Sequence, residues 1–345
     1  MQTGNTWRTG ARLLAWAALA CLCLPVAAVA ADHPAGESPG ERDSRILLWP
    51  GGLAPGDTAL EDADRITDRS DDPAMPDRFI DRVSHPYLVV YRPARPNGMA
   101  LLVTPGGGYG RIVLDNEGTG LVPDFVERGG FTLFVLRYRL PAEGHPEPRD
   151  VPLADAQRAM RLIRAHAADY RIDPHRIGVL GFSAGGHVAA SLATRFDAKV
   201  YAPLDSADRQ SARPDLQLLV YPVIDLGLEI AHAGSRERLL GAGNDATARH
   251  AYSAQNTVTG DCPPAFLVHA QDDTVVPVAN TLVYARSLLA HQVSTELHVF
   301  PVGGHGFGIG RAGGLTLSAW PRLAMDWMRW QYAHRGTGAD RETTR

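Results

Sequence analysis

Short apolar segments alternate with longer helix-like segments along this sequence, and no other feature limits its possible folds as much. Several of the short segments are apolar almost throughout, which is typical of parallel strands covered on both faces. Strands separated by helices form βαβ units. The sequence therefore predicts an α/β fold, with a mostly parallel central sheet and helices on both faces. The expected strands are Tyr87–Tyr91, Met99–Thr104, Thr132–Tyr138, Ile177–Phe182, Leu216–Tyr221, Ala265–His269 and Glu296–Phe300.

The clearest helix is expected over residues 152–169, where apolar residues recur at spacings of three and four. Further helices are expected over residues 278–291 and 315–332. The first two strands are joined by a short turn rich in Pro, Asn and Gly (93–98), so we expect them to pair antiparallel. Residues 225–262 break the alternation and are expected to form a cap-like excursion over the carboxyl edge of the sheet, where open α/β sheets bind ligands.

The N-terminal segment resembles a signal peptide, expected over residues 1–30. Arg8 and Arg12 precede an apolar run that ends in small residues. We expect cleavage near Ala30, and hence a secreted or periplasmic bacterial protein with no stable membrane association after cleavage. A membrane anchor is one alternative, although the run is short for a span and contains a proline. A lipoprotein signal at Cys21 is another.

The rest of the chain is expected to form one catalytic domain over residues 45–333, because no repeat or linker interrupts it. Residues 31–44 and 334–345 are polar and are expected to be a disordered lead-in and a disordered tail. With 345 residues, 45% of them hydrophobic, the chain can bury a large core. After cleavage Cys262 is the single cysteine, so no internal disulfide is possible.

Charge and composition make some partners improbable. The formal net charge is −4, and loss of the two arginines of the signal segment would make it −6, with no basic cluster anywhere. No nucleic acid is therefore expected as a partner. No Cys/His cluster has the spacing of a zinc site, and we expect neither a metal nor an organic cofactor.

The segment Gly181-Phe182-Ser183-Ala184-Gly185 fits the pattern G-x-S-x-G between an expected strand and an expected helix. In such an elbow the serine is strained and its Oγ is exposed above the sheet. Side chains in place of Gly181 and Gly185 would collide with neighbouring backbone. Ser183 is therefore the candidate nucleophile, and a tight turn that carries a serine by chance is the alternative.

A serine nucleophile needs a base, and the base needs an acid that orients it. Each is expected on a loop after a strand, in the order serine, acid, histidine. The segment FLVHAQDDTVVP offers Asp273, at D-x-x-V-P spacing, with Asp272 as the alternative acid. The segment ELHVFPVGGHGFG offers the glycine-flanked His305 as the base. His187 is expected to pack or orient the helix of the elbow.

Acyl transfer also needs hydrogen-bond donors for the negative oxygen that develops in the transition state. The segment LLVTPGGGYG places Gly106, Gly107 and Gly108 directly after an expected strand. The backbone N–H groups of Gly107 or Gly108, with that of Ala184, are the candidate oxyanion hole. A phosphate-binding loop is the competing interpretation, but neither of the usual glycine spacings for it is present.

Together these features resemble α/β-hydrolases of the secreted bacterial carbohydrate-esterase type, a group similar to acetyl esterases and acetylxylan esterases. The resemblance covers roughly residues 85–332. It implies that Ser183 is the nucleophile, Asp273 the acid and His305 the base. The segments that carry it are PGGGYG, FVLRYRLP, PLADAQRAMRLIRAHAADYRIDPHRIGVLGFSAGGHVAA, LLVYPVIDL, YSAQNTVTGDCPPAFLVHAQDDTVVP and FPVGGHGFGIG.

Some positions of the resemblance carry less information about function. Pro105 stands where many lipolytic relatives have histidine, which weakens the transfer of their substrate preferences. Glu117, Arg137 and Arg139 match the group's pattern, but the sequence indicates no catalytic role for them. For the two arginines we expect buried structural pairing.

The resemblance implies a serine esterase that acts through an acyl-enzyme on short acyl esters of a sugar or plant polysaccharide, with acetyl as the expected acyl group. The expected partner is thus a small ester or an acylated carbohydrate. Another hydrolase on the same scaffold, such as a feruloyl esterase or a serine peptidase, stays open as an alternative. So does a non-catalytic binding protein that keeps only the fold.

Overall fold

The computed structural model describes residues 1–2, 41, 44–72, 74–242 and 244–334, and the description below concerns the unit within residues 34–345. Three expected segments lie largely outside the described residues. They are the signal peptide apart from its first two residues, most of the lead-in, and nearly all of the tail. Within the described part, no helix is both long and apolar enough to cross a membrane.

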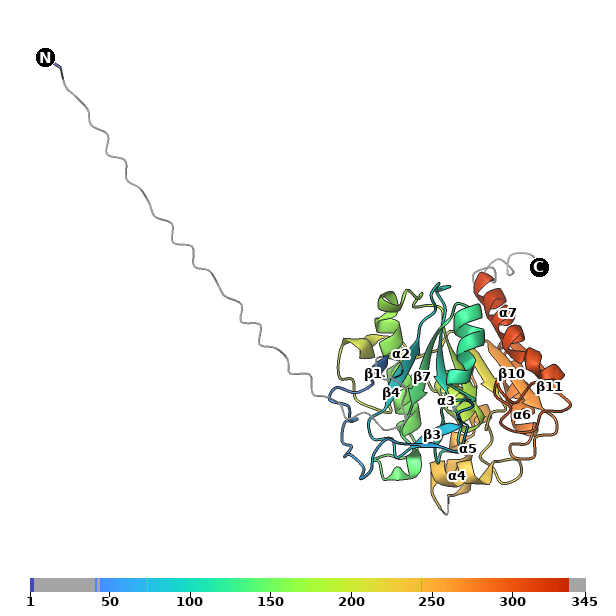
Figure 1. The fold of residues 1–345 in the computed structure, drawn as a ribbon. Helices are drawn as coiled ribbons and strands as arrows, with labels where there is room; N and C mark the ends of the chain where they lie inside the picture. Colours follow the sequence, from blue (N-terminus) through green and yellow to red (C-terminus); the bar gives the residue numbers. More distant parts are fainter. Residues whose placement is uncertain (3–40, 42–43, 73, 243, 335–345) are drawn as a thin grey trace, which may run out of the picture. The chain divides into compact units, whose positions relative to one another are not determined.

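A sheet of eight strands forms the centre of the described unit (Figure 1). Its order is β1-β4-β7-β5-β8-β9-β10-β11, and β4 is the strand that runs against the others. From β7 to β11 every neighbouring pair is parallel, as the alternation in the sequence predicts. The strands are β1 (Arg45–Leu47), β4 (Tyr87–Tyr91), β5 (Ala100–Thr104), β7 (Thr132–Arg137), β8 (Ile177–Phe182), β9 (Gln217–Val220), β10 (Ala265–Ala270) and β11 (Thr295–Phe300).

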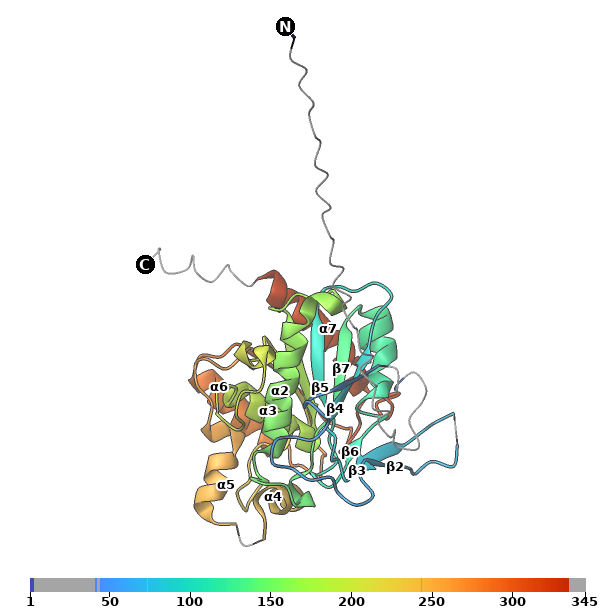
Figure 2. The same cartoon turned by 90° about the vertical axis from the view of Figure 1, so that its left-hand side faces the viewer.

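Helices cover both faces of this sheet, because alternate side chains of each strand point to opposite faces. Leu102 and Val179 pack with α2, α3 and α6 on one face. Their chain neighbours Leu101 and Leu180 pack with α7 and the π-helix η2 on the other. Helices α2, α3, α6 and α7 are labelled in Figure 2. The helices are α2 (Val151–Ala165), α3 (Ser183–Thr194), α4 (Ala233–Leu240), α5 (Ala246–Tyr252), α6 (Ala279–Ala290), α7 (Trp320–Ala333) and η2 (Val122–Arg128). Short 3₁₀ helices are η1 (Thr119–Leu121), η3 (Pro141–Glu143), η4 (Ala167–Tyr170), η5 (Ser206–Arg209), η6 (Ala254–Asn256) and η7 (Thr316–Ala319).

Two of the expected helices are each divided in the structure. The helix expected over 152–169 ends at Ala165 and continues as the separate 3₁₀ turn η4. The helix expected over 315–332 begins as η7, and α7 follows with Pro321 in its first turn. Proline is tolerated there because the first N–H groups of a helix have no partner within the helix.

The expected antiparallel pairing of the first two predicted strands is wrong. β7 lies between β4 and β5, antiparallel to β4 and parallel to β5. The turn after β4 is anchored to the start of β7. Asn97 donates to the carbonyl of Gly130 through its backbone N–H (2.9 Å) and to that of Gly129 through its side chain (2.8 Å). The connection therefore crosses over β7 instead of closing a hairpin.

A second, three-stranded antiparallel sheet was not predicted from the sequence. It has the order β2-β3-β6, with β2 (Arg65–Asp68), β3 (Arg78–Asp81) and β6 (Ile112–Val113). Its strands are short, β2 and β3 carry charges at both ends, and β6 has only two residues, so none shows the apolar alternation that reveals a strand. β6 follows directly after the glycine loop, and the small sheet thereby reaches the edge of the pocket described below.

Candidate active site

Ser183 lies at the sharp corner between β8 and α3. Its φ is +51°, a left-handed conformation that is strained for a residue with a side chain. A Cβ on Gly185 would lie 2.1 Å from the carbonyl oxygen of Thr104, and one on Gly181 would lie 2.6 Å from Cβ of Ala189. The corner therefore requires both glycines, as the sequence motif predicts.

The structure brings Ser183, His305 and Asp273 into one hydrogen-bonded chain. Ser183 Oγ lies 2.9 Å from Nε2 of His305, and Nδ1 of the same ring lies 2.7 Å from Oδ2 of Asp273. The histidine comes from the loop after β11 and the aspartate from the loop after β10. A carboxylate only accepts, so Nδ1 carries the proton and Nε2 is free to accept from the serine hydroxyl.

Asp273, not its neighbour Asp272, contacts the histidine. Its Oδ1 accepts from the backbone N–H groups of Val275 and Val276, each at 2.9 Å. Burial raises the pKa of Asp273, but hydrogen bonds from His269 and His305 outweigh that effect and set the pKa well below its ordinary value. Asp272 is exposed and accepts from the N–H of Gly304 at 2.8 Å.

His269 is a second partner of the aspartate, and the sequence analysis did not single it out. Its Nε2 lies 3.2 Å from Oδ2 of Asp273 and 2.9 Å from the carbonyl oxygen of Val276. Both neighbours are acceptors, so Nε2 carries the proton, and the hydroxyl of Thr281 donates to Nδ1 (2.7 Å). His269 is fully buried at the end of β10, four residues before the acid. That spacing was visible in the sequence, but the contact was not.

The glycine loop lies directly against the elbow. A Cβ on Gly106 would lie 2.8 Å from Cβ of Ser183, and one on Gly107, whose φ is +138°, would lie 2.1 Å from the carbonyl oxygen of Arg111. Among the described residues, the backbone N–H groups of Gly107, Gly108 and Ala184 have no hydrogen-bond partner. The N–H of Ala184 is also at the positive end of α3, where an anion is stabilised. The three predicted donors are thus unpaired beside the serine.

Glu117 is a buried carboxylate that joins two loops of the site. It accepts from the N–H of Gly106 (2.6 Å) and from the hydroxyl of Tyr221 (2.9 Å). The same hydroxyl accepts from the N–H of Gly308 (3.0 Å), and the Tyr221 ring packs edge-on against His305. Burial raises the pKa of Glu117. Glu117 therefore connects the glycine loop to the histidine loop, a role that the sequence did not reveal.

The expected pairing of the two arginines is confirmed for Arg139 and wrong for Arg137. Arg139 forms ion pairs with Asp155 (2.8 Å) and Asp57 (2.6 Å). Arg137 is buried, and its Nε and Nη1 have no hydrogen-bond partner among the described residues. Only Arg139, which lies beyond the end of β7, reaches these carboxylates.

His187 connects the elbow helix to two other segments, in agreement with its expected packing role. Its Nε2 donates to the carbonyl oxygen of Tyr252 (2.7 Å), and Nδ1 accepts from the hydroxyl of Tyr109 (2.7 Å). Burial lowers the pKa of His187 to about 4. The neutral ring is therefore the form that the folded protein stabilises.

This lowered pKa predicts a pH dependence of stability. A His187 pKa below its ordinary value contributes stability that is present above about pH 6.5 and is lost as pH falls toward 4. Between these pH values the free energy of unfolding of the wild type should fall by about 3 kcal/mol relative to that of a His187→Gln variant. Urea denaturation at several pH values measures this difference. The exposed His166, replaced in the same way, is the control, and equal pH profiles for the wild type and His187→Gln would contradict the prediction.

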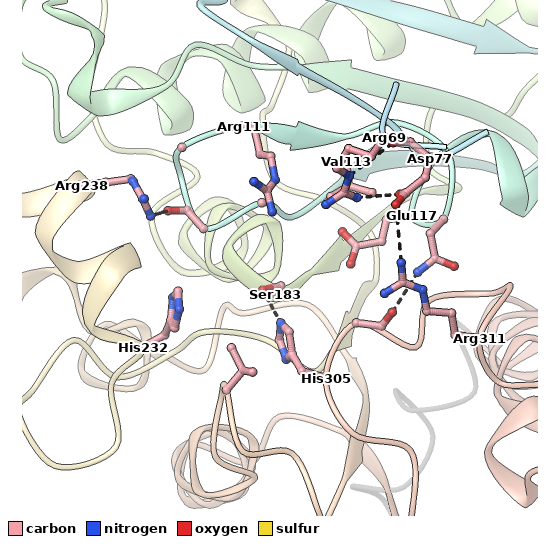
Figure 3. Close-up of a pocket in the computed structure, with 16 residues that line it drawn as sticks. Arg69, Asp77, Arg111, Val113, Glu117, Ser183, His232, Arg238, His305 and Arg311 are labelled. Atoms are coloured by element: carbon pink, nitrogen blue, oxygen red, sulfur yellow. Dashed lines mark hydrogen bonds and ion pairs between the residues drawn. The ribbon is translucent and has the colours of Figure 1, made fainter. Parts of the chain in front are cut away.

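An open pocket of about 350 Å³ surrounds Ser183 and His305 (Figure 3). Residues 225–262 contribute His232 and Arg238 to its wall, so part of this excursion lies at the carboxyl edge of the sheet. Within the described ranges, no group of three or more His, Cys, Asp or Glu side chains could hold a metal ion. The charged and titratable wall residues that the sequence did not indicate are Arg69, Asp77, Arg111, His232, Arg238 and Arg311.

The structure has a serine on a strand–helix elbow, and the acid and the histidine lie on later loops of a mostly parallel sheet. This arrangement defines an α/β-hydrolase. Residues 90–288, more than half of the chain, match the family model described as BD-FAE. The chain belongs to the BD-FAE family. The carbohydrate-esterase-like resemblance expected from the sequence is confirmed at this level.

Named relatives agree with this placement. The chain is 33% identical over 227 residues to an acetylxylan esterase of Xylanibacter ruminicola, covering 65% of this chain and 44% of that protein. It is 38% identical over 206 residues to endo-1,4-beta-xylanase B of Butyrivibrio fibrisolvens, covering 60% of this chain and 32% of that protein. The chain thus spans less than half the length of these curated relatives.

One similar solved structure is an acetyl ester-xyloside bifunctional hydrolase from Caldicellulosiruptor lactoaceticus. Its TM-score is 0.69 at 38% identity, and the match covers 84% of this chain and 96% of that one. The match therefore extends over nearly the whole of the solved chain.

Proposed function

We propose that this protein is a serine esterase that hydrolyses short acyl esters of a saccharide, with acetyl as the principal acyl group. The observation that carries the proposal is the hydrogen-bonded chain Ser183–His305–Asp273 beside unpaired backbone N–H groups. The names of the relatives support the choice of acetyl and of a xylan-related saccharide.

In the first half of the reaction, Ser183 Oγ attacks the ester carbonyl carbon while its proton moves to Nε2 of His305. The carbonyl oxygen becomes negative and is stabilised by the N–H groups of Gly107 or Gly108 and of Ala184. The ionised Asp273 stabilises the protonated imidazole and maintains its orientation. His305 then gives the proton to the departing saccharide oxygen, and the acyl group stays on the serine.

In the second half, water replaces the saccharide. His305 removes a proton from water, the resulting hydroxide attacks the acyl carbon, and the same N–H groups stabilise the negative oxygen. The bond between the acyl carbon and Ser183 Oγ breaks, and the serine recovers its proton from the histidine. Acetic acid leaves and gives its proton to water, and the three side chains return to their initial protonation states.

We also propose that the protein is exported to the periplasm or secreted. The support is the pattern of the first thirty residues, with two arginines before an apolar run that ends in Ala-Val-Ala. N-terminal sequencing of exported material should begin at about Ala31. A mature protein that retains the apolar run would contradict this proposal.

The activity is tested by comparing the release of three products by the purified protein: acetate from acetylated xylan, ferulate from feruloylated arabinoxylan, and amines from a peptide mixture. We expect acetate release to dominate. The matched control is the same protein after treatment with a fluorophosphonate, which should label Ser183 and stop acetate release. Cleavage of another bond without acetate release would reject the acetyl assignment, and no cleavage or labelling would reject the hydrolase itself.

A further inference from the structure

The pocket around Ser183 is rich in positive charge although the chain as a whole is acidic. The formal net charge of the protein is −4. Four arginines line the described pocket against two acidic side chains, Asp77 and Glu117. The arginines are Arg69, Arg111, Arg238 and Arg311. The charge of the pocket lining is therefore opposite in sign to the net charge of the chain, which indicates that the arginines serve a ligand or the local structure.

The two acidic side chains do not offset the charge of all four arginines. Glu117 is buried, and both of its oxygens already accept hydrogen bonds from the surrounding loops. Asp77 pairs closely with Arg69 (2.6 Å), and Arg311 reaches the same carboxylate at 3.7 Å. One partly buried carboxylate is therefore shared between two arginines, and the Arg311 side chain is still 63% exposed.

Two of the arginines already have structural contacts of their own. Arg69 has the ion pair just described, and Arg238 donates to the carbonyl oxygen of Gly108 (3.1 Å), next to the candidate oxyanion donors. These two side chains therefore position the walls of the pocket.

Arg111 differs from the other three. It is exposed, and among the described residues it forms no hydrogen bond or ion pair; its guanidinium lies over the ring of Phe79, 5.2 Å from the centroid. In Figure 3 this guanidinium points into the pocket, toward the side where Ser183 lies. A cation that is oriented by an aromatic ring and lacks a protein anion is available to a ligand anion.

We propose that this pocket selects esters that carry a carboxylate, and that the carboxylate belongs to the saccharide, as a uronic acid unit supplies it. Arg111 is its principal partner and Arg311 the second. The planar guanidinium matches a carboxylate with two parallel N–H···O bonds. This inference rests on the proposed esterase function and adds the class of saccharide to it.

The test compares two acetylated xylo-oligosaccharides of equal acetyl content, one with a uronic acid branch and one without. For the wild type we expect kcat/KM for acetate release to be about tenfold higher on the acidic oligosaccharide, the size of one charge-assisted hydrogen bond. Arg111→Gln should remove most of this preference and Arg311→Gln part of it. The control is Arg322→Gln, which changes an exposed arginine of α7 outside the pocket and should leave the ratio of the two rates unchanged.

Different results lead to different conclusions. Equal rates on both oligosaccharides, or an unchanged ratio in Arg111→Gln, would overturn the carboxylate subsite while leaving the esterase function in place. Absence of acetate release from both would instead contradict the esterase function. A second pair of substrates, 4-methylumbelliferyl acetate and 4-methylumbelliferyl hydrogen succinate, locates the carboxylate. A wild-type preference for the succinate that Arg111→Gln abolishes would place the carboxylate in the acyl group and overturn its assignment to the saccharide.

Discussion

Replacement of Ser183 by alanine is expected to lower kcat/KM for p-nitrophenyl acetate by at least about 10⁴-fold, because no other group in the site can form the acyl-enzyme. The residual rate would come from the backbone donors and from binding alone. The change removes one oxygen, and serine and alanine tolerate the φ of +51° about equally, so the folded structure should persist. Steady-state kinetics and thermal unfolding of the same preparation measure the two effects.

The control for this variant is Ser191→Ala. Ser191 is also a buried serine of α3 but lies outside the pocket, so its loss should leave the esterase rate near that of the wild type. A Ser183→Ala protein that still hydrolyses the ester at a tenth of the wild-type rate would disprove the nucleophile. If Ser183→Ala loses both its rate and its unfolding transition, the variant has not folded, and Ser183→Cys is measured in its place. Cysteine fills the site as serine does and is a weaker nucleophile toward this ester, so the rate should still fall.

The second large effect is expected for Asp273→Asn, with a fall in kcat of about 10⁴-fold, as amide substitution causes in other Ser-His-Asp sites. Oδ1 accepts from the N–H groups of Val275 and Val276, so the asparagine oxygen must occupy that position. The amide NH₂ then faces His305, whose Nδ1 must become an acceptor. The proton moves to Nε2, and that nitrogen can no longer accept from Ser183.

The neighbouring Asp272→Asn variant is the matched control. Its side-chain oxygen can still accept from the N–H of Gly304, and it does not contact the histidine, so its kcat should stay close to that of the wild type. A large loss in Asp272→Asn with little loss in Asp273→Asn would reverse the assignment of the acid.

Much of the central fold could be predicted from the sequence because its strands are buried on both faces. β8 and β4 have the bounds that their apolar runs predict. The insertion of β7 between β4 and β5 could not be predicted, because a short turn indicates a hairpin unless the position of a third strand is known. The strands of the small sheet, such as Arg65–Asp68 and Arg78–Asp81, carry charges at their ends and have no apolar alternation to reveal them.

In the site too, residues with a local sequence signal could be predicted, and contacts between distant segments could not. Ser183, Asp273 and His305 could be predicted because each stands in a local motif after a strand, in an order that the chemistry requires. The pair Glu117–Tyr221 could not, because its two members are 104 residues apart and neither belongs to a motif with a known mechanism. Arg69 follows β2, Arg111 precedes β6, and the other two arginines of the pocket lie on α4 and on the loop after β11. Only the folded chain shows that their charges converge.

The link through Glu117 has a consequence for motion in the site. The amides of Gly106 and Gly308 are both hydrogen-bonded within one buried unit formed by Glu117 and Tyr221. Opening of either loop would leave a buried carboxylate or phenol without its partner, so the two loops form one cooperative unit of local unfolding. Their amides should exchange with deuterium at similar rates. Any movement that accommodates substrate is then expected at the rim, where α4 and the small sheet lie, while the reacting groups stay fixed.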